Sequence, residues 1–181
     1  LLTEEELIND LEKHIDIGAD EVIIKPFDLR YLISRIKLTI RMFHSRDNNP
    51  LTGLPGNNAI SKRMGNIISP QYTEKFGVIY SDLDHFKPYN DIYGFSKGDE
   101  IILYTAKILK EAMEKFGNND DFLGHIGGDD FILITTFDKV QEISSYVCEQ
   151  FDKDAPSFYN ETDRAAGKIV AKDRVGKTKE F

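Results

Sequence analysis

Short apolar runs and longer stretches of helical periodicity alternate between residues 57 and 151. The apolar runs predict β-strands over residues 76–82, 122–126 and 131–134. Apolar positions at helical spacing predict helices over residues 57–68, 97–116 and 138–151, with a short helical turn over residues 85–93 that Gly94 closes. A glycine pair, Gly127 and Gly128, separates the second and third strands, and such pairs are typical of tight β-hairpin turns. The pattern therefore predicts helices and strands that include one antiparallel hairpin.

The helix predicted over residues 97–116 is amphipathic. Its inner face is formed by Ile101, Thr105, Ile108 and Ala112. On the outer face, Glu111 and Lys115 are one turn apart and are expected to form an ion pair. Beyond residue 154 the chain is polar, and residues 168–174 and 177–181 predict a second hairpin that turns at Gly176.

The first forty residues have a different pattern. Residues 4–15 show helical spacing, and residues 21–24 predict a short strand that ends in Lys25 and Pro26. Asp28 is a candidate N-cap for a helix with an apolar face, formed by Leu29, Leu32, Ile33, Ile36 and Ile40. Residues 45–50 are polar and end in Pro50, so we interpret them as a linker between a segment of residues 1–44 and a domain of residues 51–181.

Two acidic turns carry the candidate chemistry. Ser81-Asp82-Leu83-Asp84 ends one predicted strand, and Gly127-Gly128-Asp129-Asp130-Phe131 joins two others. Together they place four carboxylates at strand ends, beside a turn without side chains that another molecule could approach closely. Carboxylate oxygens are the ligands that Mg²⁺ prefers, and Mg²⁺ in turn holds polyphosphates. The alternative is that Asp and Gly simply favour turns, but the occurrence of both motifs next to buried-looking strands favours the functional interpretation.

The composition of the chain narrows the kinds of molecule that it could bind. The 181 residues are 40% hydrophobic and 30% charged, as in ordinary globular protein, and the net charge of -8 argues against a nucleic-acid surface. This acidity does not exclude a nucleotide, because Mg²⁺ supplies positive charge locally. The single cysteine, Cys148, excludes a disulfide framework within the chain, and no apolar run is long enough to span a bilayer. We expect no membrane segment, no signal peptide and a cytoplasmic location.

Three motifs, in order along the chain, resemble those of the GGDEF domain. They are NPLTGLPGN (residues 49–57), DLDHFKPYNDIYGFSKGDE (residues 82–100) and GHIGGDDFILI (residues 124–134). GGDEF domains are diguanylate cyclases, which make cyclic di-GMP from two molecules of GTP. The resemblance implies a palm-like α+β fold, in which a central antiparallel sheet is flanked by helices. It also implies that a homodimer is needed, since each domain holds one GTP and two must face each other.

The resemblance assigns roles around the acidic turns. Asp82 and Asp129 correspond to side-chain ligands of Mg²⁺ or Mn²⁺, and the Leu83 carbonyl to a backbone ligand. Asp130 occupies the last acidic position of the motif, which helps to activate the attacking hydroxyl or binds the metal. Asp84 is a weaker candidate, because a role as the N-cap of the following helix would explain it.

Other positions match the nucleotide-binding part of the family. Asn90 and Asp99 correspond to residues that read the guanine edge, where an amide bonds both ways and a carboxylate accepts from N–H groups that adenine lacks. Lys87 corresponds to a basic residue that contacts phosphate, although it could equally be a solvated lysine. Gly127 and Gly128 are expected beside the substrate. Asn90 and Asp99 could alternatively be a turn residue and a helix cap.

The N-terminal segment GADEVIIKPF (residues 18–27) resembles the fifth strand of response-regulator receiver domains. The resemblance makes Thr3 and Lys25 the receiver's switch residues, implies a cis peptide before Pro26, and implies an upstream sensor kinase as partner. In this interpretation residues 1–44 are the C-terminal part of an α/β receiver whose phosphorylated aspartate lies upstream. Residues 51–181 would likewise lack the last strand and helix of a GGDEF domain, so we expect this fragment itself to be weakly active or inactive.

Two departures from the family leave alternatives open. Asp130 stands where the family usually has Glu, and Asn118 and Asp121 stand where an inhibitory site has Arg-x-x-Asp. Asparagine cannot make the bidentate charged contact of arginine, which puts product feedback in doubt. The main hypothesis is a receiver-controlled cyclase. The alternatives are a degenerate domain that binds GTP or cyclic di-GMP without turnover, and a dimerisation module with incidental acidic turns.

Overall fold

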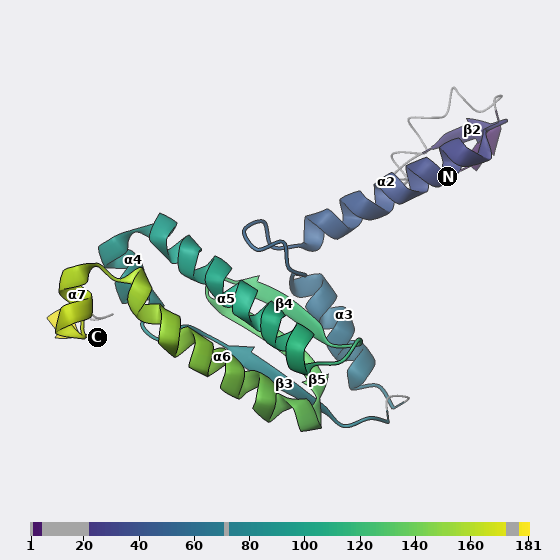
Figure 1. The fold of residues 1–181 in the computed structure, drawn as a ribbon. Coiled ribbons are helices and arrows are strands. Elements are labelled where there is room, and N and C mark those ends of the chain that lie inside the picture. Colours follow the sequence, from purple (N-terminus) through teal and green to yellow (C-terminus); the bar gives the residue numbers. More distant parts are fainter. Residues whose placement is uncertain (1, 5–21, 71–72, 173–177) are drawn as a thin grey trace. The chain divides into compact units, whose positions relative to one another are not determined.

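The computed structural model describes residues 2–4, 22–70, 73–172 and 178–181. The chain divides into two compact units, Leu1–Arg46 and Asp47–Phe181. Figure 1 labels their helices and strands.

The first unit contains two short parallel strands and a long helix. Strand β1 (Leu2–Glu4) pairs with β2 (Ile23–Lys25), with Thr3 opposite Ile24. The Lys25–Pro26 peptide bond is cis, as the receiver resemblance implies. The helix predicted over residues 4–15 lies almost wholly outside the described residues, and Glu4 itself belongs to β1.

Helix α2 (Leu29–Asp47) begins where the sequence predicts. The Asp28 carboxylate accepts hydrogen bonds from the Arg30 and Tyr31 N–H groups at 2.7 and 3.2 Å, which confirms the N-cap. The helix continues through the first three residues of the segment interpreted as a linker. Its expected apolar face is largely exposed in this structure, with Ile36 48% and Ile40 50% accessible.

The second unit is built on a three-stranded antiparallel sheet. Its strands are β3 (Phe76–Ser81), β4 (Phe122–Gly127) and β5 (Asp130–Thr136), in the order β3-β5-β4. The hairpin β4–β5 is therefore confirmed, and β3 pairs with its second strand. Because Ser81 is opposite Phe131, the residues just beyond β3 lie beside the beginning of β5. The register brings the two acidic turns to the same end of the sheet.

Helices cover both faces of this sheet. They are α3 (Asn57–Ile67), α4 (Phe86–Tyr93), α5 (Phe95–Phe116), α6 (Val140–Asp154) and α7 (Glu161–Ala166), with 3-10 turns at η2 (Phe137–Lys139) and η3 (Ala155–Phe158). Helices α5 and α6 lie side by side over the sheet, and α3 packs against β4 (Figure 1). The expected α+β fold with an antiparallel sheet and flanking helices is confirmed.

The sheet has a hydrophobic core on each side, which explains why β5 is apolar at consecutive positions. Phe131 and Leu133 are buried in one cluster with residues of α5 and α6. Ile132 and Ile134 are buried in the other, against Ile60 of α3. Alternate strand residues point to opposite faces, so a strand that is buried on both faces needs apolar residues throughout.

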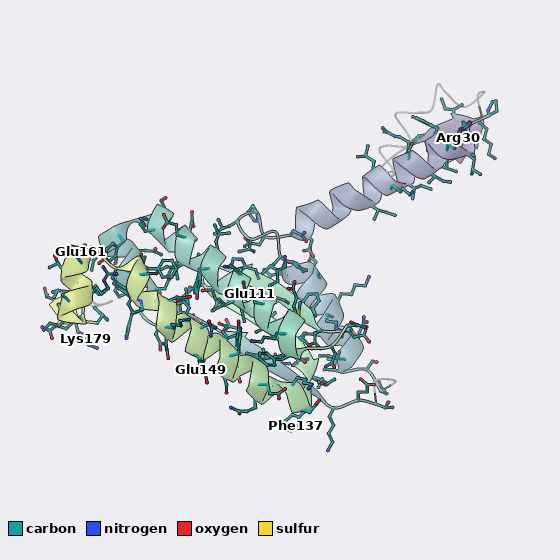
Figure 2. The ribbon with its side chains drawn as sticks, viewed as in Figure 1. Arg30, Glu111, Phe137, Glu149, Glu161 and Lys179 are labelled. Atoms are coloured by element: carbon teal, nitrogen blue, oxygen red, sulfur yellow. The ribbon has the colours of Figure 1, made fainter. Side chains whose placement is uncertain are left out.

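The structure corrects one predicted contact on α5. Glu111, which is labelled in Figure 2, pairs with Lys107. The Lys107 Nζ lies 3.6 Å from a carboxylate oxygen. The predicted partner, Lys115, instead places its Nζ 4.7 Å from the centre of the Tyr146 ring and 5.3 Å from that of Phe116. An aromatic face on the neighbouring helix α6 therefore competes with Glu111 for the lysine.

The C-terminal hairpin is confirmed in part. Strands β6 (Val170–Lys172) and β7 (Thr178–Glu180) pair antiparallel, while Gly176 lies outside the described residues. The sequence prediction missed α7, which is a short helix without an apolar stripe. Its N-cap is Asn160, whose side-chain oxygen accepts from the Asp163 N–H at 2.8 Å.

Candidate functional site: an acidic pocket at the end of the sheet

The carboxylates of Asp82, Asp129 and Asp130 are close together. Asp82 follows β3, Asp129 belongs to the hairpin turn, and Asp130 is the first residue of β5. Desolvation raises the pKa of the Asp82 carboxyl above its ordinary value, and repulsion from Asp129 and Asp130 raises it further. The fold thus concentrates negative charge at one point, an arrangement that favours a cation or a shared proton.

The structure adds Tyr80 to this group, and the sequence analysis missed it. Tyr80 is 59% exposed, and a hydrogen bond between its hydroxyl and the Asp130 carboxylate is the main cause that raises the pKa of the tyrosine. The two-residue period of a strand could have found it, because Tyr80 and Asp82 are two positions apart and so fall on the same face. Tyr80 is therefore placed to orient Asp130.

A pocket of about 760 Å³ opens beside these carboxylates. It is lined by Asp82, Leu83, Asp84, His85, Phe86, Lys87, Pro88, Asn90, Asp91, Phe95, Asp129, Asp130 and Phe181. Most of the predicted site residues thus share one concave surface. Asp99, Gly127 and Gly128 do not line it; the first is exposed on α5, and the glycines form the turn behind Asp129.

Asn90 is held against the backbone of α5. A Cβ atom added to Gly98 would lie 1.9 Å from the Asn90 Oδ1, so the asparagine needs a glycine at this position. Within the described part of the chain the buried Oδ1 has no hydrogen-bond partner. Buried polar atoms are normally paired, so an orphan at a pocket wall is typical of a group that meets a ligand. Asp99, the next residue of α5, is exposed.

The turn between β3 and α4 is shaped by His85. Its backbone is left-handed, with φ 61° and ψ 23°, which is uncommon for a residue other than glycine. The Leu83 carbonyl accepts a hydrogen bond from the Phe86 N–H at 3.2 Å, and its second lone pair is available to another partner. The prediction that Asp84 caps the helix is wrong: α4 starts at Phe86, His85 occupies the N-cap position, and no side chain makes a cap hydrogen bond.

The glycine pair is required by backbone shape. Gly127 has φ 147° and Gly128 has φ 60°, values that other residues rarely adopt, whereas a Cβ added at either would meet nothing within 4 Å. The role of both glycines is therefore to turn the chain sharply so that Asp129 and Asp130 follow at the sheet end. We expected them beside the substrate, which no contact in the structure tests.

The acidic group fits a divalent cation in its chemistry, although the described residues contain no ready cluster of three or more His, Cys, Asp and Glu ligands. The crowded carboxylates of Asp82 and Asp129, with the Leu83 carbonyl, offer hard oxygen donors of the type that Mg²⁺ and Mn²⁺ bind. Such a set is incomplete by itself. Phosphate oxygens and water commonly supply the remaining positions around Mg²⁺.

The turn that corresponds to the inhibitory site is closed on itself. The Asp121 carboxylate accepts from the Asn118 N–H at 2.9 Å, and the Asn118 side-chain amide donates to the Thr136 hydroxyl at 3.0 Å. Both side chains thus already have partners within the domain. The polar groups that would meet a ligand are used to hold the end of β5 to the loop after α5.

The family is established by comparison with known proteins. The family model "Diguanylate cyclase, GGDEF domain" matches residues 47–169, and the chain belongs to this family. It is 31% identical over 102 residues to the cyclic di-GMP phosphodiesterase PdeR of Escherichia coli, covering 56% of this chain and 14% of the relative. It is 31% identical over 88 residues to the diguanylate cyclase DgcP of Pseudomonas aeruginosa, covering 48% of this chain and 12% of the relative. The chain thus spans a small part of both relatives.

Solved structures support the fold. The diguanylate cyclase SiaD of Pseudomonas aeruginosa, solved with its activator SiaC, matches with a TM-score of 0.54 at 22% identity, over 78% of this chain and 51% of that one. The coiled coil and GGDEF domain of DgcB from Caulobacter crescentus, solved with c-di-GMP, matches with a TM-score of 0.53 at 16% identity, over 94% and 76%. At these identities the likeness concerns architecture alone. No helix in the described part of the chain is long and apolar enough to cross a membrane.

Proposed function

We propose that the protein containing this chain is a diguanylate cyclase that joins two molecules of GTP into cyclic di-GMP. The observation that carries the proposal is the convergence of Asp82, Asp129 and Asp130 beside a pocket that Lys87 and Asn90 also line. Membership of the family and relatives such as the diguanylate cyclase DgcP support it.

The proposed reaction needs positioning and charge more than covalent help. The 3′-hydroxyl of one GTP attacks the α-phosphorus of the other, the bond to the β-phosphate breaks, and pyrophosphate leaves. Two such steps close the ring. Asp130, oriented by Tyr80, accepts the hydroxyl proton, and Lys87 neutralises charge on the phosphates.

Mg²⁺ or Mn²⁺ would be held by Asp82, Asp129 and the Leu83 carbonyl. When bound, it would neutralise charge on the transferring phosphate and lower the pKa of the attacking hydroxyl. The protein's own contribution is to keep the two carboxylates crowded while leaving one lone pair of the Leu83 carbonyl free.

Asn90 and Asp99 select guanine in this proposal. The unpaired Oδ1 of Asn90 and its contact with Gly98, the residue that precedes Asp99 in α5, support this assignment. A carboxylate can accept from the guanine N1–H and exocyclic amine, which adenine does not offer. Because Asp99 does not line the pocket, this role also requires the exposed carboxylate to reach a bound base from α5.

Control by a receiver is a separate part of the proposal. The parallel pair β1–β2 and the exposed Lys25 agree with a receiver's end, in which Thr3 and Lys25 would respond to phosphorylation by a sensor kinase. Receiver-driven pairing would then bring two GTP-loaded domains face to face in a homodimer, in the cytoplasm.

The second candidate function is a degenerate domain that binds GTP or cyclic di-GMP without turnover. The shorter Asp130 and the closed turn at Asn118 favour it. The deciding experiment incubates the protein with GTP and Mg²⁺ under dimerising conditions and measures cyclic di-GMP by chromatography. Formation from GTP but not from ATP, lost in Asp82→Asn, supports the cyclase. GTP binding without product supports the degenerate domain, and absence of both contradicts each proposal.

A further inference from the structure

His125 is a buried polar residue that the proposed reaction does not use. It lies in β4 and is 2% exposed, with its ring stacked on Phe131 at 4.3 Å between centres and 18° between planes. Both ring nitrogens have partners. The Nδ1 is 2.9 Å from the Thr52 hydroxyl, and the Nε2 is 2.9 Å from the Gly128 carbonyl oxygen. A buried imidazole with two such contacts connects distant parts of the chain.

The partners fix which nitrogen carries the proton. The Gly128 carbonyl can only accept a hydrogen bond, so the Nε2 must be its donor. In the neutral ring the Nδ1 then accepts from the Thr52 hydroxyl. The Thr52 hydroxyl has two acceptors within reach, the His125 Nδ1 at 2.9 Å and the Asn49 Oδ1 at 3.5 Å, and the shorter distance favours donation to the ring. The Leu54 N–H donates to the same hydroxyl oxygen at 3.4 Å.

Thr52 is itself held in a rigid turn. The Asn49 side-chain oxygen accepts from the Leu51 and Thr52 N–H groups at 2.9 and 3.2 Å, and the Asn49 backbone carbonyl accepts from the Gly53 N–H at 2.8 Å. The backbone of His125 is anchored to the same loop, since its N–H donates to the Pro55 carbonyl at 2.9 Å. The loop of residues 49–55 therefore supports the ring from two sides.

The other end of this connection is the peptide that precedes Asp129. Gly128 contributes its carbonyl to the same peptide unit whose nitrogen belongs to Asp129. Gly127 and Gly128 have φ values of 147° and 60°, but glycines can adopt many other backbone conformations. The turn therefore needs an additional restraint to stay in this conformation. A hydrogen bond to the Gly128 carbonyl restrains the plane from which the Asp129 side chain departs.

From these contacts we infer that Thr52 and His125 are positioning residues for the acidic site, because they hold the Gly128–Asp129 peptide in the orientation that presents Asp129 to a cation. The inference rests on the proposed function and deepens it. It gives the N-terminal loop of the domain a direct hydrogen-bonded route to the metal-binding turn.

The test measures Mn²⁺ binding by titration calorimetry, independently of cyclase activity. Thr52→Val removes the hydroxyl at nearly constant volume, and His125→Phe keeps the stacked ring but loses both hydrogen bonds. Loss of groups that orient metal ligands commonly weakens metal binding roughly 10- to 100-fold, and we expect this range for both variants. Thr52→Ser, which keeps the hydroxyl, should bind Mn²⁺ nearly as the wild type does.

Thr105→Val is the matched control. Thr105 is buried in α5, and its hydroxyl donates to the Ile101 carbonyl at 2.9 Å, so the same chemical change is made away from the turn. It should lower the melting temperature without changing Mn²⁺ affinity. Equal Mn²⁺ affinity in Thr52→Val and the wild type would overturn the inference, as would equal weakening in Thr105→Val. If His125→Phe does not fold, Thr52→Val decides alone.

The same titration separates this inference from the proposed function. Suppose that the wild type binds Mn²⁺, that Thr52→Val does not, and that the wild type makes no cyclic di-GMP. This result would support the positioning role and contradict the cyclase. If the wild type makes cyclic di-GMP, and Thr52→Val matches it in both Mn²⁺ affinity and cyclic di-GMP formation, the cyclase is supported and the positioning role is contradicted. A wild type that does not bind Mn²⁺ at all would overturn both.

Discussion

The side-chain oxygen of Asn90 packs against the α-carbon of Gly98, where there is no room for even a methyl group. A Cβ atom at Gly98 would be 1.9 Å from the Asn90 Oδ1 and 3.1 Å from the Phe86 ring. One glycine on α5 thus determines where an amide of the pocket wall can lie. This contact links a helix position to the proposed recognition of guanine.

Gly98→Ala should therefore change the affinity for GTP without a matching change in thermal stability. The alanine gains up to about 1 kcal/mol of helix propensity but displaces the Asn90 side chain, so we expect GTP affinity to fall while the melting temperature changes little. Calorimetric GTP binding and thermal denaturation measure the two effects. The control is Gly65→Ala in α3, where a Cβ meets nothing within 4 Å, and this change should leave GTP affinity unaltered. Unchanged GTP affinity in Gly98→Ala would show that Asn90 is not a nucleotide ligand.

Because the three carboxylates repel one another, we expect the stability of the metal-free protein to depend on pH. The folded state raises the pKa of Asp82, so it binds a proton more tightly than the unfolded chain does, and stability falls as the pH rises through that raised pKa. Asp82→Asn should therefore stabilise the metal-free protein at neutral pH, and the gain should vanish as the pH approaches the ordinary value for aspartate. Thermal denaturation across this range is the measurement.

Adding Mn²⁺ should make the wild type more stable than Asp82→Asn, because the cation stabilises the wild type whereas Asp82→Asn lacks one of its ligands. Glu149→Gln is the control, a neutralised carboxylate on the exposed side of α6 (Figure 2). It should show neither the gain nor the reversal. Equal melting temperatures for Asp82→Asn and the wild type at neutral pH, without metal, would mean that the carboxylates do not repel one another.

Asp130 decides between an active and a degenerate domain. If it accepts the hydroxyl proton, Asp130→Asn should lower kcat by roughly two to three orders of magnitude, as loss of a single catalytic group often does. Asp130→Glu keeps the carboxylate and should retain most of the activity. The measurement is steady-state formation of cyclic di-GMP from GTP. An inactive wild type that Asp130→Glu activates would instead establish the degenerate domain and identify the missing methylene as its cause.

The turn at Asn118 predicts a cyclase without product feedback through this site. Adding cyclic di-GMP should not slow the wild type, because both Asn118 and Asp121 have partners within the domain. Asn118→Arg supplies the missing guanidinium and releases Thr136, so we expect it to introduce product inhibition. Asn119→Arg adds the same charge one residue away and serves as control. Strong product inhibition of the wild type would disprove the assignment.

Much of the fold could be predicted because periodicity records burial. The four consecutive apolar residues of β5 indicated a strand, and the structure explains them by a core on each face. The start of α5 was placed two residues late, since Gly94 and Gly98 interrupt the helical pattern. Helix α7 was missed because it has no buried residue from which a pattern could arise.

The site residues that belong to sequence motifs were predicted, whereas those that depend on how the strands pair were missed. The acidic turns were found from their spacing. The strand period could have indicated that Tyr80 shares a face with Asp82, but its hydrogen bond to Asp130 arises only in the folded chain. The same is true of the contacts that His125 makes with Thr52 and Gly128. Asp84 was misjudged as a helix cap because the left-handed backbone of His85, which delays the start of α4, has no sequence pattern of its own.

The pairing of β3 with β5 has a kinetic consequence. The β4–β5 hairpin joins neighbours in the chain and can form early, whereas β3 reaches β5 only after a long loop that contains α4 and α5 has closed. Repulsion between Asp82 and the hairpin carboxylates thus arises only when this non-local pairing forms. A cation that screens the three charges should stabilise the closing of the sheet, so the ion proposed for catalysis would also act as a folding cofactor.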